Sequence, residues 1–128
     1  MRFEKLSAQG LRDLALGASQ TPCKHCKALH CPGWDSLPAG FDRADLRQVA
    51  TLRDEESEHA TLLEYHPEGT TGWSENAPIA PTHFPYNRCE VWQCAHCTRL
   101  FLRYTEYGGY YVDERIRALN PAWIVDAP

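Results

Sequence analysis

Two Cys-x-x-Cys pairs lie near opposite ends of the chain, Cys23 with Cys26 and Cys94 with Cys97. A Zn²⁺ ion prefers soft ligands in a tetrahedron, and each pair can supply two thiolates from one tight turn. Residues 27–93 separate the two pairs, so one shared ion would tie the beginning of the fold to its end. The sequence therefore predicts a zinc site with these four cysteines as its ligands.

Two other interpretations of the pairs stay open. One pair could be a redox dithiol, although such a motif normally lies between a strand and a helix and the second pair precedes a hairpin pattern. The pairs could also be two unrelated structural elements. Cys31 and Cys89 are left over, and buried apolar side chains are the simplest interpretation for them. Each lies five positions from a pair, so a second metal site completed by His30 is the alternative.

The chain is expected not to be an enzyme. A catalytic zinc keeps one coordination position open, whereas four cysteines would close the site. The sequence contains no G-x-S-x-G, P-loop, H-E-x-x-H or G-x-G-x-x-G motif. The remaining enzymatic alternative is a dithiol, or a Cys31 or Cys89 nucleophile beside a histidine. His25 and His96 lie inside the two pairs, where we expect their rings to point to solvent.

The elements that must position the cysteines are predicted from residue periodicity. Residues 3–18 have the apolar spacing of a helix with Ser7 as N-cap, and residues 42–53 have that of a second helix capped by Asp42. Residues 59–65 alternate like a short strand. The turn-rich segment 67–86 reads as an ordered loop.

The clearest element is a hairpin after the second pair. Residues 90–93 lead into that pair, residues 99–106 and 110–117 alternate as two strands, and Gly108-Gly109 suits the tight turn between them. One face of this hairpin is expected in the core. We therefore predict an α+β fold, a small antiparallel sheet with two N-terminal helices, that forms one zinc-binding domain over residues 1–128.

The second pair and its surroundings resemble part of a known fold. Trp92-Gln93-Cys94-Ala95-His96-Cys97, followed by Phe101 and a glycine-turned hairpin, is similar to the second knuckle of a zinc ribbon. The resemblance implies that two cysteine knuckles at hairpin tips grip one Zn²⁺. Zinc ribbons often have glycine directly after the second cysteine of a knuckle, whereas this chain has Lys27 and Thr98 there.

Composition and charge narrow the class of protein. The 128 residues suit one domain, 43% are hydrophobic, and no run is long and apolar enough to span a membrane. The first residues lack an apolar signal core, so a cytoplasmic protein with reduced thiols is expected. The net charge of −4 is concentrated in an acidic block. The acids of this block are Asp42, Asp45, Asp54, Glu55, Glu56, Glu58, Glu64, Glu68 and Glu75.

These features favour a module that binds a protein partner with a basic surface. One concrete form is an immunity or antitoxin-type protein that masks a basic nuclease toxin. The aromatic residues expected at its surface are Trp34, Trp73, Tyr107, Tyr110, Tyr111 and Trp123. The alternative is a nucleic-acid-binding zinc ribbon that uses Arg99, Arg103, Arg115 and Arg117. The sequence pI of 5.8 disfavours that alternative.

Overall fold

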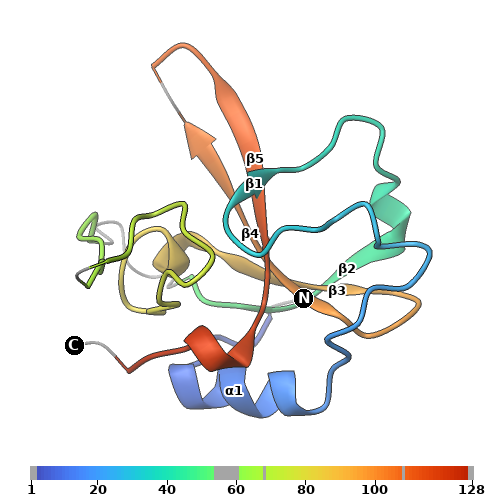
Figure 1. Cartoon of the computed structure of the whole chain (residues 1–128), viewed down its shortest axis with the longest axis horizontal. Coiled ribbons are helices and arrows are strands. Elements are labelled where there is room, and N and C mark those ends of the chain that lie inside the picture. The colour runs from blue at the N-terminus through green and yellow to red at the C-terminus, as the bar shows by residue number, and fades with distance from the viewer. Residues whose placement is uncertain (1–2, 54–60, 68, 108, 127–128) are drawn as a thin grey trace.

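A five-stranded antiparallel sheet forms the centre of the molecule. The computed structural model describes residues 3–53, 61–67, 69–107 and 109–126. The strand order is β1-β5-β4-β3-β2, and one α-helix, α1, packs against the sheet (Figure 1). The strands are β1 (Asp35–Ser36), β2 (Leu46–Thr51), β3 (Glu90–Cys94), β4 (Leu100–Tyr107) and β5 (Val112–Ala118). Short 3-10 turns are η1 (Arg43–Asp45), η2 (Tyr86–Arg88) and η3 (Pro121–Trp123). The predicted α+β class with a small antiparallel sheet is confirmed.

Helix α1 (Ala8–Leu16) is the first of the two predicted helices, in shorter form. Ser7 caps it as expected, because its hydroxyl accepts the backbone N–H of Gly10 at 3.1 Å. The buried face carries Ala8, Leu11 and Ala15. Residues before the cap are extended, because they pair with the end of β2 through an isolated bridge between Lys5 and Thr51. That pairing uses the backbone groups that a longer helix would need.

The second predicted helix, over residues 42–53, is wrong. Asp42 does cap a turn, and its carboxylate accepts the N–H of Ala44, but the turn is the short η1 and the chain then enters β2. A β-bulge between Gln48 and Ala50 shifts the register against β3. The bulge breaks the two-residue period, so Leu46 faces one side of the sheet and Ala50 the other. The resulting apolar spacing imitates a helix in the sequence.

The predicted strand over residues 59–65 is also not found. His59 lies outside the described residues, and residues 61–65 have no strand partner in the part of the chain that the structure describes. The segment is instead tied to the loop before β3. Phe84 N–H donates to the Leu63 carbonyl, and the Asn87 side chain donates to the Thr61 carbonyl. An alternating pattern forms a strand only where a neighbouring strand can accept its backbone hydrogen bonds.

The predicted hairpin is confirmed as β4 and β5, which pair from Phe101 with Ala118 to Tyr107 with Val112. Its tip extends beyond the rest of the molecule (Figure 1). Gly108 lies outside the described residues. The base is buried on both faces rather than on one, since Leu102 packs toward α1 and Phe101 packs toward the cysteines. The hairpin therefore joins two separate clusters of buried side chains.

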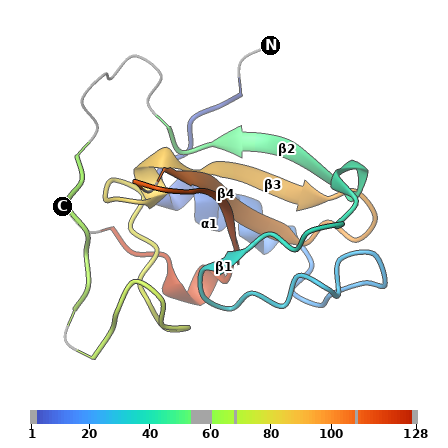
Figure 2. The same ribbon diagram turned by 90° about the horizontal axis from the view of Figure 1, so that it is seen from above.

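The two clusters lie on opposite faces of the sheet. The helix-side cluster contains the buried residues of α1 with Leu100, Leu102 and Ile79, and α1 lies behind β3 and β4 in Figure 2. The cysteine-side cluster is smaller and contains Cys26, Leu29, Cys31, Leu46, Cys94, Phe101 and Ile116. Among the described residues, no helix has the length and apolar character that crossing a bilayer requires.

Candidate metal centre

The four cysteines of the two pairs converge at one point on the cysteine side of the sheet. The Sγ atoms of Cys23 and Cys26 are 3.8 Å apart, those of Cys23 and Cys94 are 3.7 Å apart, and those of Cys26 and Cys97 are 3.6 Å apart. All six cysteines of the chain are free thiols. A tetrahedron with Zn–S bonds of about 2.3 Å has edges of about 3.8 Å. The cluster therefore has the dimensions of a four-thiolate metal site.

Each pair is held in a tight turn by backbone hydrogen bonds. In the first, the N–H groups of Cys26 and Lys27 donate to the Cys23 carbonyl. The second turn connects β3 to β4, and there Thr98 N–H donates to the Cys94 carbonyl. Thr98 has a φ of +71°, in the left-handed region that favours glycine. This is one of the two positions where zinc ribbons often have glycine, so the backbone keeps the knuckle conformation although the residue type differs.

The first pair reaches the second from a loop, since the chain leaves α1 at Gly17 and reaches Cys23 without further regular structure. Ser19 N–H donates to Thr98 Oγ1 at 3.1 Å, which places the loop against the second turn. Cys94 pairs with Leu46 in β2, so the second turn is fixed by the sheet on both sides. The sheet thus positions one pair directly, and the loop brings the other to it.

The thiols have unequal proton affinities. Burial tends to raise the pKa of Cys23, but hydrogen bonds from the backbone N–H groups of His25 and Cys26, and from the sulfurs of Cys97 and Cys94, lower it to about 6. The pKa of Cys97 is raised to about 12, by burial first and then by the neighbouring sulfurs. Burial also raises the pKa of Cys94. Sulfurs this close repel one another as thiolates, and a divalent cation among them removes that repulsion.

Cys31 and Cys89 lie apart from this cluster and from each other. Cys31 is buried on the cysteine side and Cys89 on the helix side of the sheet. Their thiols donate to the carbonyls of Leu29 and Pro85, and burial raises the pKa of both, for Cys31 to about 11. His30 is exposed, and among the described residues it does not form a group with Cys31 or Cys89 that could bind a metal ion. The interpretation as buried apolar side chains fits this placement, and a second site from these cysteines does not.

His25 and His96 behave differently from the prediction. Their side chains are 36% and 40% exposed, but the rings stack on each other with centroids 3.6 Å apart and planes 21° apart. His96 Nε2 lies 2.8 Å from a carboxylate oxygen of Asp45, and His25 Nδ1 lies 4.0 Å from the same oxygen. Asp45 lies far from both histidines in the sequence, so its position beside them was not predicted. The contact between the two histidines could have been predicted. His25 and His96 each occupy the third position of a cysteine pair, and two pairs around one ion bring their equivalent residues together.

The arginines of the nucleic-acid alternative are largely unavailable to a phosphate backbone. Arg117 is completely buried and donates to the carbonyls of Pro32, Glu75 and Ala77 and to the Tyr86 hydroxyl. Buried Arg99 donates to the Leu29 carbonyl. Arg103 is paired with Glu90 and Glu114, and Arg115 with Asp113. Two of these arginines are therefore bound to backbone carbonyls in the interior, and the other two form ion pairs with neighbouring acids.

Three exposed tyrosines gather at the tip of the hairpin, whereas Phe3, Tyr65 and Trp73 are exposed elsewhere. Tyr107 is 78% exposed, and Tyr110 and Tyr111 are also exposed. Trp73 is exposed, and the Cζ atom of the Arg115 guanidinium lies 4.5 Å from the centroid of the Trp73 ring. Trp34 was expected at the surface but is buried, edge-on against Tyr104 with centroids 4.8 Å apart. The hairpin tip is thus the main exposed aromatic surface of the described residues.

Comparison of the chain with protein-family models, with curated proteins and with solved structures gives no match. The resemblance to a zinc ribbon therefore rests on the sulfur cluster and its two turns.

Proposed function

We propose that this chain is a zinc-stabilised, non-catalytic module that binds a protein partner with a basic surface. The observation that carries this proposal is the contrast between a tightly held base and an exposed tip in one hairpin. The base of β4 is fixed by packing on both faces. The tip presents Tyr107, Tyr110 and Tyr111 together with exposed Val112. Tyrosines on a rigid support are favoured as anchors in protein interfaces, because ordering them costs little side-chain entropy.

Zinc is the ion that best suits the four sulfurs. Tetrahedral thiolate sites in proteins hold Zn²⁺ or belong to iron–sulfur proteins, and sulfur separations of 3.6 to 3.8 Å match a single ion. Four cysteines leave no open coordination position, which supports a structural role. Elemental analysis of the purified protein should give about one Zn²⁺ per chain. A folded protein without metal and with all its thiols titratable would exclude this part of the proposal.

The acidic block supports the choice of a basic partner. Asp54, Glu55, Glu56, Glu58 and Glu68 lie outside the described residues, so their contribution is argued from the sequence. An acidic segment attracts basic surfaces and repels phosphate backbones. An immunity or antitoxin-type protein that masks a basic nuclease is one concrete form of this function. Co-expression with such a toxin would then restore growth of the host cell.

The test begins with the hairpin tip. Proteins captured by the wild type from cells of its source are purified, and their affinity for the chain is measured directly. Replacing Tyr107, Tyr110 and Tyr111 by Ser should weaken binding at least tenfold, about 1.4 kcal/mol. The matched control is Leu16→Ser, which removes an apolar side chain that is 80% exposed at the end of α1. Equal binding by the tip variant and the wild type would contradict the proposal.

Charge reversal separates a protein partner from a nucleic acid. Replacing Asp54, Glu55, Glu56 and Glu58 by Lys should slow association with a basic protein, and the effect should shrink at high salt. The same change would strengthen binding to RNA or DNA. Tight, salt-sensitive binding of the wild type to nucleic acid, lost on mutation of Arg103 and Arg115, would favour the alternative function.

A further inference from the structure

A second group of metal-binding side chains lies beside the four cysteines. One ring nitrogen each of His25 and His96 and one carboxylate oxygen of Asp45 all lie within 4.8 Å of one another. We propose that these three residues form a second, solvent-accessible site for a divalent transition-metal ion of the Zn²⁺ and Co²⁺ class. This site is distinct from the closed sulfur cluster and independent of the proposed partner.

The donor set has the right chemistry. Two neutral imidazoles and one carboxylate are borderline ligands that suit Zn²⁺, Co²⁺ and Ni²⁺ better than Ca²⁺ or Mg²⁺. An imidazole that binds a metal through one nitrogen keeps its proton on the other, so each ring can ligate without losing its neutral form. The three residues together would carry one negative charge, which partly neutralises a divalent ion. Two histidines and a carboxylate therefore form a chemically complete set of protein ligands.

The separations of the ligand atoms are close to those around one ion, and the orientation of the two rings has to change. Around one ion with bonds of about 2.1 Å, ligand atoms lie roughly 3.0 to 4.2 Å apart. His96 Nε2 is 2.8 Å and His25 Nδ1 is 4.0 Å from the same oxygen of Asp45. Both histidine side chains are partly exposed, so rotation of the rings can bring the nitrogens to bonding distance. The lone pair of a ring nitrogen lies in the plane of the ring, so the stacked rings, with planes 21° apart, must tilt away from each other to direct both lone pairs at one ion.

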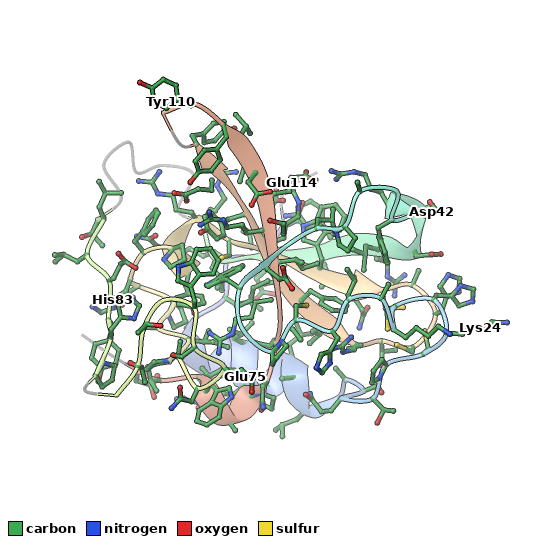
Figure 3. The ribbon with its side chains drawn as sticks, turned by 45° about the horizontal axis from the view of Figure 1, so that its top comes forward. Lys24, Asp42, Glu75, His83, Tyr110 and Glu114 are labelled. Carbon is green, nitrogen blue, oxygen red and sulfur yellow. The ribbon has the colours of Figure 1, made fainter. Side chains whose placement is uncertain are left out.

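The three side chains are held together by three separate segments. His25 lies in the first cysteine turn, His96 in the second, and Asp45 at the end of η1. Ala95 N–H donates to the Asp45 carbonyl at 2.8 Å, which fixes η1 against the second turn. Figure 3 shows Lys24 of the first turn and Asp42 beside η1 at the same end of the molecule. The site is therefore assembled by the tertiary structure and has little freedom to lose on binding.

The exposure of the site determines how it would behave. His25 and His96 are more than one-third exposed at their side chains, whereas Cys26 and Cys94 are almost completely buried. Three protein ligands leave coordination positions for water, and an ion there can enter and leave from solvent. We expect an exchangeable ion that clamps the two turns together, in contrast to the permanent ion expected at the sulfurs.

The test uses the full chain after reconstitution with one equivalent of Zn²⁺, and Co²⁺ is the probe. Calorimetry should show one further equivalent of Co²⁺ bound. The visible absorption should be weak and without thiolate charge-transfer bands, which would appear if Co²⁺ replaced zinc at the cysteines. The double variant His25→Ala with His96→Ala should lose this second equivalent. Asp45→Asn should weaken it at least about tenfold, the cost of even an outer-shell change.

The matched control is His30→Ala with His66→Ala. It also removes two imidazoles, one of them in the exposed His66–Glu64 pair, and should bind Co²⁺ like the wild type. The melting temperature should rise with Co²⁺ in the wild type and in this control but not in the His25 and His96 variant. No further equivalent in the wild type, or equal binding by the His25 and His96 variant, would overturn the proposal. If the cysteines fail to take up zinc, the zinc module is excluded, while the Co²⁺ titration still decides the histidine site.

Discussion

The two faces of the sheet are stabilised in different ways. On the helix side, α1 and the C-terminal segment cover an apolar cluster that includes Leu11, Leu100 and Leu102. On the other side, no described α-helix covers the strands, and the smaller cluster around Phe101 is bordered by the four sulfurs. Apolar burial contributes about 25 cal/mol for each Å² removed from water. A face without a covering helix has less of this contribution, and metal binding can replace it.

The two faces also differ in how their segments are held together. The helix side joins its elements by many small apolar contacts, so the loss of one contact removes only part of the stability of that face. The cysteine side joins a loop from the N-terminal part to a turn between β3 and β4 mainly at one point, the four sulfurs, beside which Ser19 and Thr98 form a hydrogen bond. Its loss should release the first turn, while Leu29 and Cys31 beyond it remain hydrogen-bonded to Arg99 and Ala118.

The largest effect is expected for Cys94→Ser, which removes one ligand from that point. Zinc binding supplies on the order of 10 kcal/mol in small zinc peptides, comparable to the whole stability of a domain. Thermal melting should therefore shift strongly or vanish, and zinc content should fall. Cys31→Ala, on the same face of the sheet but outside the group of four sulfurs, is the control, and it should keep its zinc. An unchanged melt of Cys94→Ser would place this cysteine outside a structural metal site.

A smaller effect is expected for Leu102→Ala on the helix side. Leu102 is completely buried, and truncation of a buried leucine costs about 2 to 5 kcal/mol. Denaturant unfolding should show this loss of stability, while elemental analysis should still give the wild-type zinc content. Loss of zinc from this variant would show that the two faces are not separate in the way the packing indicates.

Alkaline pH should destabilise the cysteine side through Cys31. Burial raises the pKa of this thiol from 9.0 to about 11. Between these values the unfolded chain releases the proton and the folded chain retains it, so stability is full below pH 9 and falls as the pH rises to 11. The total is about 2 to 3 kcal/mol. Unfolding free energies measured from pH 8 upward should fall less steeply for Cys31→Ala, and parallel curves would contradict this assignment.

The smallest effect is expected for Thr98→Gly in the second cysteine turn. A left-handed conformation costs a non-glycine residue roughly 1 to 2 kcal/mol, and glycine removes that cost. The variant also loses the hydrogen bond from Ser19 to Thr98 Oγ1, worth about 1 kcal/mol, so the net gain should stay below about 1 kcal/mol. A precise melting comparison at saturating zinc would detect it. A clear loss of stability would mean that the Ser19 contact outweighs the strained backbone.

The sequence by itself determined the features that depend on local chemistry. Two Cys-x-x-Cys pairs predict adjacent thiols, because two residues between the cysteines leave room only for a tight turn. Ser7 caps α1 and Asp42 caps η1, because their side chains reach backbone N–H groups nearby in the chain. Alternation predicted the β4–β5 hairpin, whose partner strands are neighbours in the chain. These features require little information from distant residues.

Only the tertiary structure decided the remaining features. The bulge at Gln48 to Ala50 depends on pairing with β3, so an apolar spacing typical of a helix became a strand. Residues 61–65 alternate but found no partner strand among the described residues. Asp45 meets His25 and His96 only because the two cysteine turns converge. Long-range pairing and convergence depend on which segments compete for the same backbone groups, and local propensity does not contain that information.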